Sequence, residues 1–220
     1  NFEKISIILN GADDKLFAFK KKEIINKTVN LVTHHWSNNY MKGFDIYNFI
    51  DKQILTSKQM KYKINFTYIG NMPKDFKFVN TKTIDPLDGT DLVNELNKHN
   101  IYVTASINEP GGNHQNEAAL CGLPVLYRDS GCLPEYCNGY GLMFNFENFE
   151  QKLYELINKH SFYAEALSKY PNTANKMNFE YHKLFNKLIT EKNSILKNRK
   201  FNQKNFENYL NLSSYYISLI

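Results

Sequence analysis

The chain has 220 residues, 42% of them hydrophobic, so it can form one sizeable domain with a packed core rather than a disordered segment. The formal net charge of +5 is modest: it allows a phosphate ligand or an anionic membrane surface without requiring either, and we expect no nucleic-acid partner. Three cysteines without a Cys-x-x-Cys pair argue against a disulfide framework and a zinc site, and no apolar run approaches the roughly 20 residues that cross a bilayer. A reducing, cytoplasmic setting fits these features best.

Residues 1–26 are predicted to hold a linker and a first short strand. The apolar stretch within Lys4–Phe17 ends at Asn10-Gly11, which is a turn signal. The lysine-rich residues 18–26 are expected to form a surface loop. Because the chain begins at Asn1 without a methionine or a targeting segment, we expect a fragment or one domain of a longer protein.

Apolar, β-branched runs alternate with amphipathic segments over the middle of the chain. This alternation predicts an α/β fold with a Rossmann-like, doubly wound parallel sheet over residues 27–195. The predicted strands are Lys27–Thr33, Tyr62–Ile69, Lys77–Thr83, Ile101–Ser106, Leu123–Tyr127 and Gly141–Phe144.

Helices are predicted between these strands and after the last one. Phe44–Leu55 is amphipathic, and Thr90 is a candidate N-cap for a helix over Asp91–His99. From Asn145 onward the apolar spacing is helical, with a break at Pro171. A helical tail over residues 196–220, aromatic and apolar at its end, completes the prediction.

The centre of the chain carries two carboxylates around a glycine turn. Glu109 follows the strand Ile101–Ser106, Gly111 and Gly112 form the turn, and Glu117 lies on the helix after it. A glycine turn before a helix offers free backbone N–H groups to an anion, while carboxylates accept hydrogen bonds from hydroxyl groups. Phosphate and hydroxyl groups together suggest a nucleotide or a nucleotide-sugar.

These residues resemble a known family. Glu109-Pro-Gly-Gly, followed by Glu117-Ala-Ala-x-x-Gly-Leu-Pro-Val, is similar to the E-x7-E region of retaining GT-B glycosyltransferases of the family 4 type (glycosyl transferases group 1). A second stretch resembles the family's G-G-L-P-E and G-L-L-F segments: it runs from Asp129 to Tyr136 and from Gly139 to Phe144, with Cys132 in place of the second glycine.

The resemblance implies the C-terminal half of a GT-B fold with a C-terminal helical extension. The segment that ends in Asn10-Gly11 is similar to the one that opens this domain, so we expect the chain to start at the interdomain linker, with the N-terminal GT-B domain missing as a partner. The acceptor site would lie in that missing half.

One family motif is only half present. Family members carry Gly-Arg-Leu-x-x-x-Lys-Gly after the first strand, where Arg and Lys grip the diphosphate. Lys42-Gly43 matches its second half, but Ser37 stands where the Arg would fall. Lys42 is therefore the main candidate for binding the diphosphate, with a solvated surface lysine as the alternative. His35 or a neighbour could take over the role of the Arg.

The resemblance also assigns roles to single residues. Glu109 would contact the hydroxyls of the donor sugar as the catalytic residue, and Glu117 would bind the ribose. Leu87 either packs on the base or anchors the core, and His114 either reaches a phosphate or is exposed. The remaining donor-binding candidates are Gly70, Gly111, Gly112 and Asn113.

The implied reaction transfers a sugar from a nucleotide-sugar such as a UDP- or GDP-sugar to an acceptor hydroxyl, with retention and without a metal or cofactor. The acceptor would be a saccharide, a lipid-linked sugar or a protein, as in polysaccharide biosynthesis. The enzyme would work in the cytoplasm, or in peripheral association with the inner face of a membrane. Two alternatives stay open: a nucleotide-sugar epimerase of the GT-B fold, and a non-catalytic module that binds a nucleotide-sugar.

Overall fold

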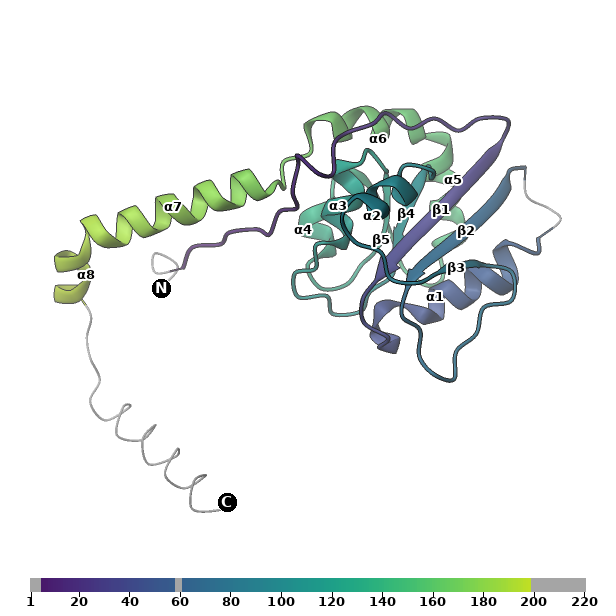
Figure 1. The fold of residues 1–220 in the computed structure, drawn as a ribbon, viewed down its shortest axis with the longest axis horizontal. Coiled ribbons are helices and arrows are strands. Elements are labelled where there is room, and N and C mark those ends of the chain that lie inside the picture. Colours follow the sequence, from purple (N-terminus) through teal and green to yellow (C-terminus); the bar gives the residue numbers. More distant parts are fainter. Residues whose placement is uncertain (1–4, 58–60, 199–220) are drawn as a thin grey trace, which may run out of the picture. The chain divides into compact units, whose positions relative to one another are not determined.

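A computed structural model describes residues 5–57 and 61–198 of the chain. Its centre is a sheet of six parallel strands in the order β3-β2-β1-β4-β5-β6 (Figure 1). This confirms the predicted doubly wound α/β fold. The strands are β1 (Thr28–His35), β2 (Lys63–Gly70), β3 (Lys82–Ile84), β4 (Ile101–Thr104), β5 (Val125–Arg128) and β6 (Gly141–Phe144).

Helices cover both faces of the sheet and form two cores with it. One core holds apolar residues of α1 (Phe44–Phe49), the π-turn η3 (Ile50–Ile54) and α5 (Phe149–Asn158). The other core lies on the opposite face. It is formed by α2 (Gly89–Leu96), α3 (His114–Leu120) and α4 (Leu133–Cys137).

The central strands are buried on both faces because neighbouring residues point to opposite cores. Leu31 lies in the first core and Val32 in the second, and both are fully buried. Cys121 is buried in the second core, and all three cysteines are free thiols.

The third strand is shorter than predicted. The sequence predicts Lys77–Thr83, whereas β3 covers only Lys82–Ile84. Asp51 explains the difference, because its buried carboxylate accepts hydrogen bonds of 2.7–2.9 Å from the backbone N–H groups of Val79, Asn80 and Thr81. These bonds lower the pKa of Asp51 although burial raises it. The N–H groups are therefore held by a side chain and are not available to a neighbouring strand.

Two further boundaries differ from the prediction. Helix α2 begins at Gly89 with Asp88 in the N-cap position, so Thr90 lies inside the first turn rather than before it. The described part of Lys4–Phe17 forms no strand; it contributes a single bridge, between Ala12 and Thr173. Ile5 and Ile7 are largely exposed, so the apolar pattern there is not matched by burial on a sheet.

The chain divides into a compact body, Ile7–Phe179, and a second unit formed by the residues before and after it. The body ends with α6 (His160–Ala166), the 3-10 turn η4 (Leu167–Lys169) and the first part of α7 (Ala174–Thr190); α8 (Lys192–Asn198) belongs to the second unit. In α7, Phe179, Phe185 and Ile189 are exposed, so within residues 5–57 and 61–198 its predicted apolar spacing does not form a buried face. Nearly all of the predicted tail 196–220 lies outside the described residues. No helix in the described ranges is both long enough and apolar enough to cross a bilayer.

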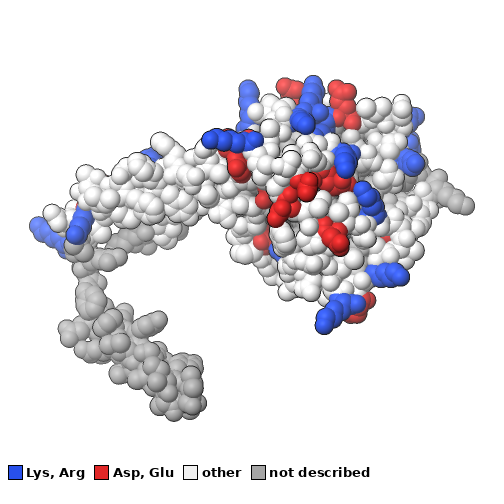
Figure 2. Space-filling view, viewed as in Figure 1, with Lys and Arg blue, Asp and Glu red and all other residues white. Residues whose placement is uncertain are grey.

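Acidic and basic side chains are interspersed over the face of the body that Figure 2 shows. This pattern agrees with the modest net charge of +5. A binding site for an anion must therefore be recognised from particular residues and not from the overall charge.

Candidate functional site

The strand order reverses between β1 and β4, which lie side by side at the centre of the sheet. Such a reversal opens a crevice outside the carboxyl ends of the two strands, and open α/β sheets bind their ligands there. The loops that follow the two strands carry Lys42 after β1 and Glu109 after β4. The candidate residues from two distant parts of the sequence therefore lie at the same edge of the sheet.

Lys42 and Glu109 form an ion pair, with 2.7 Å between Lys42 Nζ and Glu109 Oε2. The Glu109 side chain is only 5% exposed, whereas that of Lys42 is 25% exposed. A carboxylate buried to this extent needs a compensating partner, and Lys42 supplies it. Lys42 is therefore partly buried and held in an ion pair.

The backbone around Lys42 explains why a glycine follows it. Gly43 has a φ of 99°, and a Cβ atom at this position would overlap with Ala105 at the end of β4. The carbonyl of Met41 accepts a hydrogen bond of 2.7 Å from the N–H of Ile107. The Lys-Gly motif is therefore fitted closely onto the β4 loop, and this contact directs Lys42 toward Glu109.

The second resembling stretch, Asp129–Tyr136, supports Glu109 from the other side. The N–H of Cys132 donates a 2.8 Å hydrogen bond to the carbonyl of Glu109, and the N–H of Asn108 donates one of the same length to Ser130 Oγ. Asn108 takes a left-handed conformation with a φ of 53°. The stretch therefore has a structural role at this site, which is to fix the loop that presents the buried carboxylate.

The glycine turn lies directly against the same carboxylate. A Cβ atom on Gly112 would come within 3.0 Å of Glu109 Oε1 and 2.7 Å of His114 Nδ1. Asn10 Nδ2 donates a 2.6 Å hydrogen bond to the carbonyl of Gly111 and so ties the turn to the start of the body. We predicted Asn10 only as part of a chain turn; its contact with Gly111 spans 101 residues and has no local signal. Asn113 is exposed at the start of α3.

Glu117 contacts a residue that sequence reasoning did not connect with it. His34 Nε2 lies 2.8 Å from Glu117 Oε2, and the two side chains are 6% and 23% exposed. Among the described residues His34 Nδ1 has no hydrogen-bonding partner, although it is buried. The next residues of α3, Ala118 and Ala119, are fully buried, so Glu117 sits at the edge of the core.

Two further histidines pack beside this pair. The rings of His35 and His114 are 4.9 Å apart, and burial lowers the pKa of both well below the usual value, with neighbouring positive charges as smaller causes. His35 Nε2 is 2.8 Å from the Tyr47 hydroxyl, and His114 Nε2 is 2.9 Å from Thr104 Oγ1. Because both rings are neutral at neutral pH, His35 does not supply the charge of the missing Arg.

The histidines do not form a metal centre. Within the described ranges, no three His, Cys, Asp or Glu side chains are arranged to hold a metal ion. Ser37, at the position of the family's Arg, lies in an exposed loop, where its Oγ accepts a 3.2 Å hydrogen bond from the N–H of Asn39. Lys42 remains as the cation of the site.

A small hollow beside the histidines contains Leu87 and Trp36. Leu87 lines this hollow and also packs against the second core, so both interpretations of this residue agree with its position. Trp36 is 63% exposed and is the single tryptophan of the chain. Gly70 ends β2 with a φ of 138°, and a Cβ atom there would overlap with the carbonyl of His35. Strand packing alone therefore requires glycine at position 70.

The neutral histidines predict a pH-dependent stability. Below about pH 6.5 each such ring takes up a proton in the unfolded chain but stays neutral in the folded chain. For each of these rings, the free energy of unfolding therefore falls by about 1.4 kcal/mol for every unit by which the pH is lowered. We expect urea unfolding to show this loss between pH 7 and pH 5, above the range in which the lowered carboxyl groups Asp51 and Glu95 titrate. The rings with a lowered pKa are His35, His99, His114 and His160.

The matched variants are His114→Gln and His182→Gln. Removing the packed ring of His114 should reduce the difference in unfolding free energy between pH 7 and pH 5 by about 1–2 kcal/mol. His182 is exposed on α7, so the second variant should keep the wild-type difference. Equal pH dependence in wild type and His114→Gln would contradict a neutral His114.

Comparison with known protein families and with curated proteins finds no match. Solved structures do match. The C-terminal domain of a glycosyl transferase group 1 family protein (LpcC) from Francisella tularensis is 19% identical with a TM-score of 0.55, over 76% of this chain and 99% of that one. HepE from Anabaena, determined in complex with UDP, is 18% identical with a TM-score of 0.66, over 86% of this chain and 59% of that one.

A glycosyltransferase from Rickettsia africae matches in the same way, at 16% identity and a TM-score of 0.65, over 86% of this chain and 58% of that one. The chain thus spans less than two thirds of the two longer proteins and almost all of the isolated C-terminal domain. The strand order defines a doubly wound α/β domain whose switch point lies between β1 and β4, where open sheets of this kind bind their ligands. More particularly, the fold is that of the C-terminal domain of GT-B glycosyltransferases, as the resemblance implied.

Proposed function

We propose that this chain is the donor-binding domain of a retaining glycosyltransferase of the family 4 type. It would bind a nucleotide-sugar in the crevice between the β1 and β4 loops. The observation that carries the proposal is the ion pair between the half-buried Lys42 and the buried Glu109 at the switch point of the sheet. Two charged groups kept in a nearly buried position at a ligand-binding edge are more typical of a site than of a stabilising device.

Each residue of the site would bind a different part of the nucleotide-sugar donor. Lys42 would bind the diphosphate and stabilise the negative charge that develops on it as the glycosidic bond breaks. Glu109 would accept hydrogen bonds from the hydroxyls of the sugar, and Glu117, oriented by His34, would accept those of the ribose. Trp36 and Leu87 line a small hollow, and the base would stack over them at its rim. The reaction would use no metal and no cofactor.

The donor proposal is supported by what the matched proteins bind: HepE is in complex with UDP, and a matched starch synthase from Arabidopsis thaliana is bound to ADP and acarbose. The acceptor, a saccharide or a sugar on a lipid or protein, would be bound together with a second GT-B domain. A cytoplasmic site of action, at or near a membrane, is part of the same proposal.

A non-catalytic nucleotide-sugar-binding module is the second candidate. The observation that favours it is the missing Arg, since Ser37 lies in its place and the neutral His35 does not replace the charge. An enzyme would release the free nucleotide from its donor when the acceptor is present, whereas a binding module would not. Assay of nucleotide release from the bound donor, with the second GT-B domain and an acceptor present, separates the two candidates.

The test of donor binding uses Trp36 as a reporter. We expect UDP, GDP or ADP, or one of their sugar conjugates, to change the fluorescence of this exposed and only tryptophan in a saturable way, because the base would lie next to its ring. Titration calorimetry with the same ligands should return the same dissociation constant. No saturable signal in either measurement would contradict the proposal.

Glu117→Gln is the variant that tests the ribose contact. The substitution keeps the shape of the side chain but removes its negative charge, with which both His34 and the ribose hydroxyls would interact. The affinity for the nucleotide should therefore fall about tenfold. Glu147→Gln changes the charge equally at an exposed position and should leave the affinity unchanged. If both variants bind like wild type, Glu117 is not a ligand-binding residue.

A further inference from the structure

The edge strand β2 is paired along only part of its length. On one side β1 pairs with all of Lys63–Gly70, but on the other side β3 pairs only with Thr67–Ile69. Among the residues that the structure describes, none pairs with Lys63–Phe66 on this second side. An unpaired strand edge presents a row of backbone N–H and C=O groups that can bind another strand.

The direction of these groups follows from the strand geometry. The N–H of Lys63 donates a 2.9 Å hydrogen bond to the carbonyl of Lys27, so it points toward β1. Successive residues of a strand direct their backbone groups to opposite sides. The backbone N–H and C=O groups of Ile64 and Phe66 therefore point away from β1. The open edge thus has backbone donors and acceptors at regular spacing.

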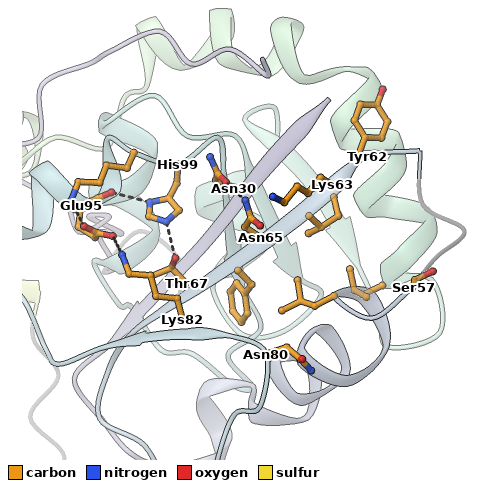
Figure 3. A pocket seen from close by; sticks show the side chains of 15 residues that line it. Asn30, Ser57, Tyr62, Lys63, Asn65, Thr67, Asn80, Lys82, Glu95 and His99 are labelled. Carbon is orange, nitrogen blue, oxygen red and sulfur yellow. Dashed lines mark hydrogen bonds and ion pairs between the residues drawn. The ribbon is translucent and has the colours of Figure 1, made fainter. Parts of the chain in front are cut away.

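A groove of about 740 Å³ runs along this edge (Figure 3). We call it the edge groove; it is lined on one side of β2 by apolar residues and on the other side by polar residues. The apolar wall consists of Ile64 and Phe66 with Ile54 and Leu55 of the segment after α1. These four side chains belong to, or pack against, the first core, so the wall is fixed by the fold.

The polar wall carries a positive excess. Lys63, Lys82 and Lys98 line the groove, and Glu95 is its one carboxylate among the lining residues. Glu95 is already engaged by Lys82 at 3.0 Å and by Lys98 at 2.5 Å, whereas no ion pair involves Lys63 within the described chain. Figure 3 shows Lys82, Glu95, Thr67 and His99 linked by hydrogen bonds on this side of β2. The wall therefore favours negatively charged side chains.

An added strand would meet both walls in alternation, because successive side chains of a strand point to opposite faces of a sheet. One set of its side chains would lie on the side of Leu55 and Ile64, and the other set on the side of the lysines. Two copies of this chain would fit poorly, since pairing their equal edges would bring the lysines of both polar walls together. The groove thus selects a segment in which apolar and acidic residues alternate.

We propose that the edge groove binds an extended segment of a partner protein, with alternating apolar and acidic residues, as an additional strand beside β2. This interaction is separate from the donor site, which lies at the carboxyl ends of β1 and β4. A glycosyl donor and such a segment would bind at the same time. The domain would then carry a recruitment surface in addition to its ligand site.

The test measures fluorescence anisotropy of a labelled peptide with the sequence Val-Glu-Val-Glu-Val-Glu-Val on the full chain. One control peptide has the same composition with its glutamates in one block; the other carries N-methyl groups at every residue, which removes its backbone N–H donors on both edges. We expect saturable binding of the alternating peptide and at least about tenfold weaker binding of both controls. Equal affinity for the three peptides, or no saturable binding, would overturn the proposal.

Two variants with the same net charge locate the site on the chain. Lys63→Glu replaces attraction by repulsion at the groove and should weaken the alternating peptide about fivefold. Lys74→Glu makes the same charge change at an exposed lysine that does not line the groove, and should leave affinity unchanged. Both variants should keep the wild-type urea unfolding transition. An equal effect of both on the peptide would indicate general electrostatic attraction and would refute the edge groove as its site.

Discussion

Lys42→Met is expected to abolish most of the affinity for a nucleotide-sugar and to destabilise the domain. The affinity should fall about thirtyfold or more, since a charge-assisted bond to the diphosphate is worth about 2 kcal/mol. The free energy of unfolding should fall by about 2 kcal/mol, because the substitution leaves Glu109 as a nearly buried carboxylate without its partner. Titration calorimetry and urea unfolding measure the two effects.

The double variant Lys42→Met/Glu109→Gln separates binding from stability. Removing both charges should restore most of the lost stability, because no buried charge remains unpaired, but it should not restore the affinity. Lys74→Met, at an exposed lysine outside the site, should match wild type in both measurements. If Lys42→Met keeps the wild-type affinity and stability, the ion pair has neither of the roles assigned to it.

Gly43→Ala is expected to have the largest effect on the fold. Its left-handed φ of 99° and the overlap of the new Cβ with Ala105 should together cost about 3 kcal/mol or more. Gly139→Ala is the matched control: its φ of 87° is also left-handed, but nothing lies within 4 Å of the new Cβ. That control should cost only about 1 kcal/mol.

The comparison isolates the contact between the β1 and β4 loops from the backbone preference. Urea unfolding gives both free energies, and donor titration of the Gly43→Ala variant should show that affinity is lost together with the position of Lys42. Equal destabilisation by the two substitutions would mean that Gly43 does not need its close approach to Ala105.

The central part of the fold follows from patterns that are local in the chain. Gly141–Phe144 was predicted with the observed bounds of β6, because a glycine turn precedes a short apolar run there. The strands Lys27–Thr33 and Tyr62–Ile69 were predicted within two residues from their apolar and β-branched runs. The predicted start of the third strand was wrong because a side chain distant in the sequence determines it. Asp51 accepts hydrogen bonds from the backbone N–H groups that would otherwise continue β3.

In the candidate site, too, some features follow from the sequence pattern and others depend on contacts between distant residues. The proximity of Lys42 and Glu109 was implied by the order of motifs on a doubly wound sheet, since both residues follow central strands. The contact between His34 and Glu117 joins positions 83 residues apart, and no spacing rule connects a strand histidine with a helix carboxylate. Asn10 was missed as a support of the glycine turn because a turn signal does not indicate what the side chain contacts.

The bridge between Ala12 and Thr173 brings together two positions near the ends of the body. The N–H of Ala174 donates a 2.7 Å hydrogen bond to the carbonyl of Ala12, and the N–H of Ala12 donates one of 3.3 Å to Asn172. The chain therefore enters and leaves the body at one place. The sheet should form whichever of its strands comes first in the sequence. A circularly permuted body, closed by a short linker at this bridge and opened in an exposed loop, should fold to the same sheet and keep the same crevice.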